Sequence, residues 1–437
     1  MNSTRLRFHY GYVIVACCCL MMGINVGISF SCAGIFYRPV SESLGIPVGE
    51  FGIYMSIMYI TSTIFLPFAG RLLERYSSRW LFAANAAAMG LIYISMGLYD
   101  SVWEFYIAGG LLGITLAFLL YLSFPTLVNR WFRSRIGFMI GICSAASGIG
   151  GMLLNPLAGW MITEWGWRWA YATFGGLILL IIVPLLALLL RDYPSDIGLE
   201  PYRSRKDVSN DDSKVLKEGM TYREASRSPM FYGIILFAFI MMGTSTLNLF
   251  IPGYVSDNGF SLEQASLAAS AVMAGVTVGK LALGWINDRS CLTGVAVTTI
   301  AGIGGLLVLL VGAESIALIL SGGFLFGWAY AGVTVQTAML TRNVFGSADY
   351  GRIYSVVSIA LSAGGAVASG GWGLLADSTS DRFIFICGTV CLAICLLTGI
   401  MVLRNKKSQS SNGSTTKPKS FFPSLASDPK NREKSRH

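Results

Sequence analysis

The sequence predicts an all-α membrane protein with twelve transmembrane helices in two six-helix, pseudo-symmetric halves. Three observations lead to this prediction: the composition, the number of long apolar segments, and a repeat that relates the two halves. Of the 437 residues, 54% are hydrophobic and only 13% are charged, and the mean hydropathy is +0.61. An ordinary soluble domain carries about 25% charged residues. A chain of this composition has to turn much of its apolar surface toward lipid.

Twelve apolar segments are long enough to cross a bilayer as helices, which takes about 20 residues. Glycine and proline occur within many of them, as membrane helices tolerate. The predicted spans are 11–37, 50–70, 80–99, 104–128, 136–162, 167–190, 229–254, 262–286, 292–312, 315–340, 351–376 and 382–403.

The polar segments divide the chain into four parts. Residues 1–190 form the N-terminal six-helix half, and 229–404 form the C-terminal half. Between them, 191–228 carries eight Lys/Arg and eight Asp/Glu, which predicts a cytoplasmic linker. Residues 405–437 are rich in Ser, Lys and Asn, which predicts a disordered cytoplasmic tail.

The residue types exclude most catalytic chemistry. The two histidines, His9 and His437, lie near the chain ends, so histidine triads and multi-histidine metal sites are excluded. Eight of the nine cysteines lie in apolar runs without a CxxC pair, which is typical of small packing side chains. There is no P-loop or dinucleotide fingerprint either. We therefore expect no enzyme activity, no metal site and no cofactor.

The basic residues gather on one side of the predicted membrane. With the N-terminus in the cytoplasm, 28 of the 32 Lys and Arg fall on the cytoplasmic side, and only Arg38, Arg168 and Arg382 fall outside. This bias predicts a multi-pass protein of the cell membrane with both termini in the cytoplasm. The net charge of +9 is thus a topology signal, and we expect no nucleic acid partner.

A shift of 214 residues brings landmarks of the two halves into register. Gly70 pairs with Gly284, and Arg75 pairs with Arg289, at the ends of the second and eighth spans. Further along, Asn129 pairs with Asn343, Gly137 with Gly351, and Arg168 with Arg382. Parallel repeats of this kind imply a pseudo-twofold axis along the membrane normal and a central cavity between the halves.

Two loops carry a resemblance to a known family. The run from Gly70 to Arg79 resembles the loop signature of the major facilitator superfamily, and the run from Gly284 to Arg289 resembles its second copy. In that signature the glycine allows close helix approach, and the acid binds a basic group or a helix end across the cytoplasmic gate. The resemblance covers residues 8–404 and implies these gating residues: Gly70, Glu74, Arg75, Arg79, Gly284, Asp288 and Arg289. The first copy departs from the signature, with Glu74 for the usual Asp and Ser77 for the usual Gly.

Within the superfamily, the first and eighth spans are similar to those of monocarboxylate and oxalate/formate-type porters. The first span carries Tyr10-Gly11-Tyr12 and the run 29–39, and the eighth carries the run 279–285. Those relatives usually have Arg where this chain has Lys280, and the resemblance implies that this residue binds a carboxylate. The span-1 lysine of the animal porters falls on Ser31, and the acid of their eighth span falls on Val276. The span-11 lysine of the oxalate exchangers has no counterpart in 353–375.

Lys280 is the one Asp, Glu, Lys or Arg that we place inside a span outside the signature loops. A lysine at the centre of a membrane helix costs about 2.5–3.5 kcal/mol on insertion scales, which marks it as functional. Since no acid lies in the predicted spans, its natural counter-ion is an anionic substrate. Two other roles stay open, a part in the cytoplasmic gate and snorkelling along the helix to water.

A few polar side chains in the spans are candidates to share the substrate site. Tyr121 and Asn25 rank first, because they lie near the middle of spans that line the cavity in this superfamily. The alternative for each is an interhelical hydrogen bond, typically worth about 0.6 kcal/mol. The other candidates are Ser31, Tyr59, Ser245, Asn248, Tyr330 and Gln336.

These observations predict a secondary transporter of a small organic anion, with a monocarboxylate as first candidate, that works as a proton symporter or an anion exchanger. We expect it to be a monomer in the lipid bilayer. The alternative is an exporter of amphipathic drugs or metabolites. A third hypothesis, a membrane sensor that does not transport, predicts that deletion of 405–437 abolishes function.

Overall fold

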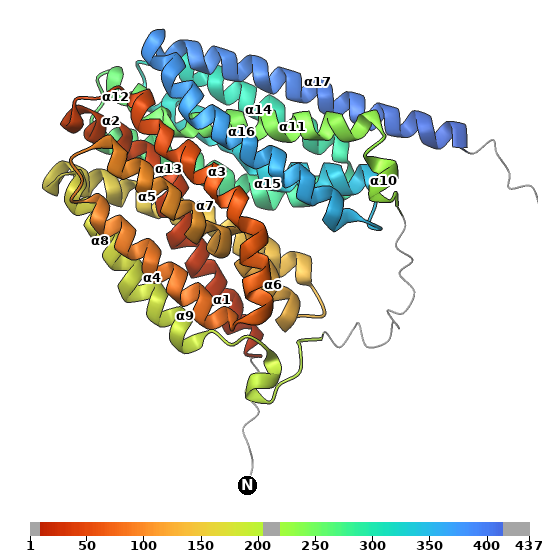
Figure 1. Ribbon diagram of the computed structural model, residues 1–437. Coiled ribbons are helices and arrows are strands. Elements are labelled where there is room, and N and C mark those ends of the chain that lie inside the picture. The colour runs from red at the N-terminus through yellow and green to blue at the C-terminus, as the bar shows by residue number, and fades with distance from the viewer. Residues whose placement is uncertain (1–8, 204–218, 414–437) are drawn as a thin grey trace, which may run out of the picture.

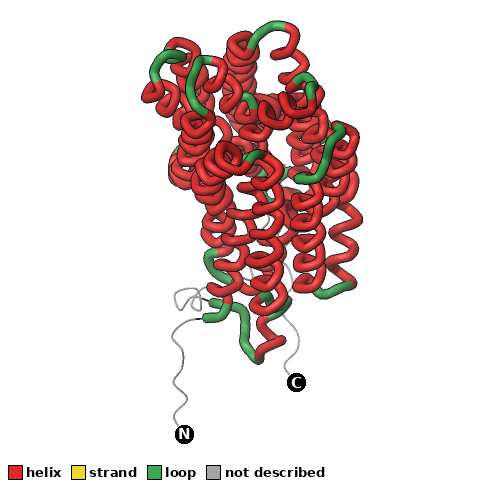
Figure 2. The backbone as a smooth tube through the Cα atoms, turned by 90° about the vertical axis from the view of Figure 1, so that its left-hand side faces the viewer, coloured by secondary structure: helices red, strands yellow, loops and turns green. Residues whose placement is uncertain are grey.

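The computed structural model describes residues 9–203 and 219–413 (Figure 1), and within them the chain is helical and forms no β-sheet. The helices run along the molecule, and the loops gather at its two ends (Figure 2). Eleven helices are long and apolar enough to cross a membrane, and the shorter α4 (Ser78–Met96) is the twelfth of the fold. The prediction of an all-α protein with twelve membrane helices is confirmed.

The N-terminal half contains six spans, and three of them change helix type midway. Span 1 is α1 (Gly11–Met21), η1 (Met22–Ser31) and α2 (Ala33–Leu44). Spans 2, 3 and 5 are α3 (Val48–Arg75), α4 and α7 (Ile136–Trp165). Span 4 is α5 (Val102–Leu116), η2 (Ala117–Leu122) and α6 (Ser123–Trp131), and span 6 is α8 (Trp167–Leu177), η3 (Ile178–Ile182) and α9 (Val183–Leu189).

The C-terminal half is more regular. Span 7 is α11 (Pro229–Ser245), η6 (Thr246–Leu249) and α12 (Ile251–Asp257), and spans 8 and 9 are α13 (Leu262–Arg289) and α14 (Cys291–Val311). Spans 10 to 12 are α15 (Ile316–Phe345), α16 (Tyr350–Ser378) and α17 (Asp381–Gly413). Between the halves lie two short helices, η4 (Pro194–Ile197) and α10 (Tyr222–Ala225).

Several helix bounds repeat at the predicted spacing of 214 residues. The helices α3 and α13 both have 28 residues, and they begin at Val48 and Leu262. The α5–α6 span and α15 begin at Val102 and Ile316, while α7 and α16 begin at Ile136 and Tyr350. Because three pairs of helices share one offset, each half repeats the same arrangement.

Two boundaries differ from the predictions. The first span continues beyond residue 37 to Leu44, and its middle is the π-helix η1, where Gly23 and Gly27 let α7 approach closely. The last helix runs to Gly413, so the predicted tail is helical over 405–413. The rest of the tail and the middle of the linker, 204–218, lie outside the described residues.

The two halves meet along two helix pairs, α3 with α16 and α7 with α13. Small residues make this packing close: a Cβ on Gly49 would lie 2.5 Å from the backbone of Gly373, and one on Gly159 would lie 2.6 Å from the side chain of Ser266. We call these helix pairs the two seams. The end of the molecule with Gly49, Gly159 and Gly373 is the closed end.

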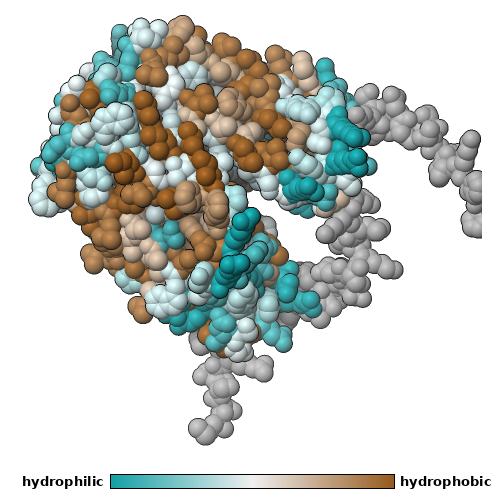
Figure 3. Space-filling view, viewed as in Figure 1, coloured by the Kyte–Doolittle hydropathy of each residue, from teal (hydrophilic) through white to brown (hydrophobic). Residues whose placement is uncertain are grey.

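The halves separate at the opposite end. A Cβ added to Gly70, Gly137, Gly284 or Gly351 would meet no atom within 4 Å. Figure 3 shows the surface hollowed between the halves at this end, with hydrophilic side chains on both rims. We call it the open end. The described chain therefore has the shape of a V that closes at one end.

Candidate functional site

The centre of the V holds four of the predicted site residues around one small cavity. They are Tyr59 of α3, Ser245 of α11, Asn248 of η6 and Tyr330 of α15, so the cavity has walls from both halves. The cavity measures only about 10 Å³, roughly the space of one water molecule. Its remaining lining residues are Phe30, Met55, Thr246 and Leu249.

Aromatic packing fixes the walls of this cavity. The rings of Phe30 and Tyr59 lie 5.4 Å apart, and Tyr59 packs against α16 at Gly365. On the other side, Asn248 is 2% exposed, and its Oδ1 has no hydrogen-bond partner among the described residues. An acceptor oxygen without a donor is costly inside a protein. The cavity thus combines an apolar wall with one polar group that can still accept a hydrogen bond.

Ser31 and Asn25 of η1 lie in the interior of the protein. Ser31 is 4% exposed and sits against α7, because a Cβ on Gly151 would lie 2.6 Å from its Oγ and 2.7 Å from Met273. Asn25 is 1% exposed, and neither atom of its amide has a partner among the described residues. Both residues are therefore buried near the first span's π-helix, and Ser31 reaches the seam between α7 and α13.

One predicted residue, Gln336, lies away from this group. Gln336 is fully buried within the C-terminal half, where it accepts a 2.8 Å hydrogen bond from Asn287 and lies 3.4 Å from the carbonyl oxygen of Cys291. Its amide connects α15 to α13 and α14. Tyr121 lies in the π-helix η2, but its side chain lies outside the described part of the chain.

Lys280 lies on the seam between α7 and α13. Its Nζ donates to the backbone carbonyl of Ser144 (2.9 Å) and to Oγ of Ser147 (3.0 Å), both on α7 of the opposite half. Seven residues before it on α13, Met273 faces Ser31, so Lys280 lies about 10 Å closer to the open end. Its side chain is half-buried, and its two partners are neutral.

The signature loops lie at the open end. Gly70 and Gly284 face open space, while Glu74, Arg75 and Asp288 are exposed. The guanidinium of Arg289 lies over the ring of Trp285, 3.5 Å from its centroid. Among the described residues, neither of the two ion pairs involves a signature loop. In this conformation the loops do not bridge the two halves.

Arg79 instead ties the N-terminal half together at the open end. Its Nε donates to the carbonyl of Ala187 (2.6 Å), and its backbone N–H donates to Asp192 (2.8 Å). Asp192 also accepts the N–H of Ser78, so it caps the N-terminus of α4. Sequence reasoning missed Asp192, because it is more than a hundred residues away along the chain.

The closed end is held by polar contacts between the halves. Arg38 of α2 forms an ion pair with Asp257 of α12. The carboxylate of Asp377 accepts the N–H of Gly49 (2.8 Å) in the first turn of α3, where the helix dipole favours an anion. A cavity of about 360 Å³ lies beside these contacts, and Asp381 and Arg382 also line it. The sequence predicted only that Arg38 and Arg382 lie on the outer side.

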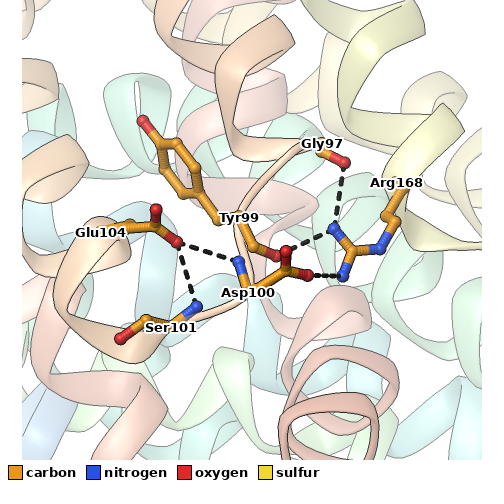
Figure 4. Close-up of polar contacts among 6 residues, drawn as sticks. All are labelled: Gly97, Tyr99, Asp100, Ser101, Glu104 and Arg168. Atoms are coloured by element: carbon orange, nitrogen blue, oxygen red, sulfur yellow. Dashed lines mark hydrogen bonds and ion pairs between the residues drawn. The ribbon is translucent and has the colours of Figure 1, made fainter.

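A second ion pair at this end lies within the N-terminal half (Figure 4). Arg168 of α8 donates to the carboxylate of Asp100 (2.6 Å) and to the carbonyl of Tyr99 (2.9 Å) in the loop between α4 and α5. From the first turn of α5, Glu104 accepts the N–H groups of Asp100 and Ser101 in this loop. This network stabilises one half and does not connect it to the other.

Comparison with known proteins assigns the class. The sequence profile of the Major Facilitator Superfamily matches residues 15–289 and 234–431. The chain belongs to this family. The members of this family are membrane transporters rather than enzymes, and two of the matching relatives are named as transporters. The predicted resemblance to the superfamily is confirmed.

Two curated relatives differ in what their names say they transport. Monocarboxylate transporter 12 of Rattus norvegicus is 26% identical over 306 residues, which cover 65% of this chain and 62% of that protein. The multidrug resistance protein MdtG of Escherichia fergusonii is 32% identical over 139 residues, which cover 31% of this chain and 34% of that protein. The chain thus matches less than two thirds of the length of either relative.

Two solved structures share the fold. A bacterial homologue of the human lysosomal transporter Spinster, in an inward-facing and unoccupied conformation, matches with a TM-score of 0.70 and 13% identity, covering 93% of this chain and 99% of that one. The nucleoside transporter NupG matches with a TM-score of 0.71 and 11% identity, covering 89% of this chain and 99% of that one.

Proposed function

We propose that this transporter carries a small organic anion, with monocarboxylates as the first candidates. The observation that supports this is Lys280, a cation on a membrane-spanning helix whose described partners are two neutral oxygens. Neither ion pair among the described residues involves it. A lysine within a membrane helix costs about 2.5–3.5 kcal/mol on insertion scales. A substrate carboxylate would supply the missing counter-charge.

The position of Lys280 fits a site used by both halves in turn. It belongs to the C-terminal half but contacts α7 of the N-terminal half. This contact lies where the close packing of α7 and α13 ends and the two helices begin to separate toward the open end. An anion bound there would contact both halves as they rock about the centre. A lysine offers a point charge rather than a two-pronged fork, which suits a small anion held at one point.

The other candidates complete the proposed site. Tyr59, Asn248 and Tyr330 line the small central cavity, and Asn25 and Ser31 are buried on η1. We propose that the cavity enlarges during the transport cycle and that these groups contact the non-acidic part of the substrate. The name of the rat relative supports a monocarboxylate as that substrate.

We infer the orientation from the charges. The open end carries the signature loops and most Lys and Arg residues, so we assign it to the cytoplasm together with both termini. The conformation then faces inward, in a cell membrane. Proton symport and anion exchange both fit this arrangement, and we propose a monomer.

A second candidate function is export of amphipathic compounds. The central cavity favours it, because Phe30, Met55 and Leu249 give it an apolar wall without a charged residue. The similarity to MdtG points the same way. An exporter of this kind would prefer cationic compounds and would keep its activity when Lys280 is replaced by alanine.

Uptake into proteoliposomes tests the proposal. Purified wild type and Lys280→Ala are compared with labelled acetate, pyruvate and oxalate, and with a labelled lipophilic cation. Saturable uptake of one acid, lost in the variant although it still elutes as a folded protein, supports anion transport. If the wild type takes up none of the acids but moves the cation, the exporter function replaces our proposal.

A further inference from the structure

The seam between α7 and α13 is closed up to Lys280 and open beyond it. Toward the closed end, Oγ of Ser270 donates to the carbonyl of Met152 (2.6 Å), and Gly148 faces Thr277. Toward the open end, Cβ atoms added to Gly141 and Gly284 would meet nothing within 4 Å. The bonds of Lys280 to Ser144 and Ser147 are thus the last polar contacts before the two helices diverge.

The three groups form a closed triangle of hydrogen bonds. Oγ of Ser147 donates to the carbonyl of Ser144 (2.8 Å), so its hydrogen is directed there and its lone pairs are left for the ammonium. Nζ of Lys280 donates to both oxygens and has three N–H donors in all. The bond to Ser144 therefore turns the hydroxyl of Ser147 so that it can accept from the lysine, and the carbonyl and the hydroxyl together hold the lysine against the opposite half.

An anion that binds Lys280 competes with these two oxygens. A carboxylate carries a full negative charge, which neither the carbonyl of Ser144 nor the hydroxyl of Ser147 carries. It would draw the ammonium away from α7 and so release the seam at the point where it begins to open.

We propose that Ser147 is a positioning residue: it ties Lys280 to the N-terminal half, and an anion that binds Lys280 competes with this tie. Anion binding and the opening of the α7–α13 seam are then coupled. This inference rests on the proposed function, in which Lys280 binds the anion. It adds the group that competes with the substrate and the helix pair that responds to it.

A double-mutant cycle tests the tie without any substrate. Spin labels are introduced as unnatural amino acids at Tyr76 and Leu292, both exposed at the open end on opposite halves, because the chain has nine native cysteines. The distance distribution in nanodiscs reports the ratio of open to closed forms. Ser147→Ala should change this ratio about threefold in the wild type, as expected for one hydrogen bond between membrane helices, and should change nothing in Lys280→Ala.

Two further variants separate this role from simple packing. Ser270→Ala removes another hydroxyl that donates from α13 to α7, and its effect should be the same with or without Lys280. Ser147→Thr keeps the hydroxyl and should restore the wild-type ratio. An equal effect of Ser147→Ala in both backgrounds would overturn the inference, whatever the substrate is.

Anion binding is the second readout. The acid that the wild type takes up, from the panel of acetate, pyruvate and oxalate, should bind Ser147→Ala about threefold more tightly, because its competitor is gone. Weaker or unchanged binding overturns the inference but leaves the proposed function intact. If none of the three acids is taken up, the proposed function fails, and the spin-label cycle alone decides whether Ser147 holds Lys280.

Discussion

The two seams are built from the same repeat and differ in a charge toward their open ends. One face of α3 contacts α16 at Gly52, Ser56 and Tyr59 and continues toward the open end with Thr63, Leu66 and Gly70. We call this row of residues the α3 stripe. The α13 stripe at the same register contains Ser266, Ser270, Met273, Thr277, Lys280 and Gly284. Where one stripe has Leu66 the other has Lys280, so the charge is a property of one seam and not of the repeat.

The facing helices differ in a matching way. On α7, Ser144 and Ser147 accept the lysine, and the same register on α16 holds Ser358 and Leu361. Ser358 donates to its own helix, at the carbonyl of Tyr354 (2.9 Å). Thus one seam places two oxygens beside a cation, and the other places none at the same register. The comparison shows that the repeat determines how the helices of the two seams pack. A few residue differences between the repeats determine which seam carries the candidate anion-binding lysine.

Placing a lysine in the other seam should have the largest effect. Leu66→Lys adds a charge on α3. On α16, the residue at the register of Ser147 is Leu361, which offers no hydroxyl to the new ammonium. The substitution should therefore cost about 2.5–3.5 kcal/mol on insertion scales. We expect a several-fold loss of membrane-inserted protein, measured by the fluorescence of a fused reporter in purified membranes. Leu66→Met is the control and should keep the wild-type yield. A full yield of Leu66→Lys would mean that the two seams tolerate charge equally.

Removing the ion pair across the closed end should have an intermediate effect. Arg38 and Asp257 are about one third and one half exposed, and exposed pairs contribute 0.2–1 kcal/mol, or up to about fivefold in population. Asp257→Asn should therefore shift the protein toward forms that are open at this end, seen as a longer distance between spin labels there. Exchanging the two residues, Arg38→Asp with Asp257→Arg, should recover much of the closed form. An unchanged distance in Asp257→Asn would show that the helix packing alone closes this end.

The other ion pair of this end lies inside one half and gives the contrast to that prediction. Arg168→Ala removes the bonds to Asp100 and the carbonyl of Tyr99, which are confined to the N-terminal half (Figure 4). We expect a melting temperature a few degrees lower, because hydrogen bonds to charged groups contribute about 1.5–3 kcal/mol before allowance for exposure. The distances between the halves should stay the same. A shift in those distances would mean that the loop takes part in gating.

The smallest effect is expected from the hydroxyl pair in the α3–α16 seam. Oγ of Ser56 and Oγ of Ser369 lie 2.9 Å apart, and a hydrogen bond between membrane helices averages about 0.6 kcal/mol. Ser56→Ala should thus alter the population of open forms at most threefold. The same spin-label distances measure it, and a tenfold change would show that this seam, rather than the one with Lys280, controls the opening.

The sequence predicted the helices well, because long apolar runs and one repeat offset are visible along the chain. It also predicted that Lys280 is a charged residue inside a membrane span and a candidate to bind the substrate. It did not predict the partners of that charge, since Ser144 and Ser147 lie more than 130 residues away and meet it only in one arrangement of the halves. Gln336 shows the same limit: the pattern marks a polar group in a span, but not whether it faces the cavity or bonds to Asn287.

The most direct test of the central claim compares an acid with its neutral amide. Uptake of the labelled carboxylate and of the matching amide is measured in proteoliposomes for wild type and Lys280→Leu, which makes α13 resemble α3 at this position. Our account predicts that the wild type prefers the acid by at least about tenfold and that the variant loses this preference while it remains folded, since 1.4 kcal/mol of charge recognition is a factor of ten. An undiminished preference for the acid in Lys280→Leu would contradict it.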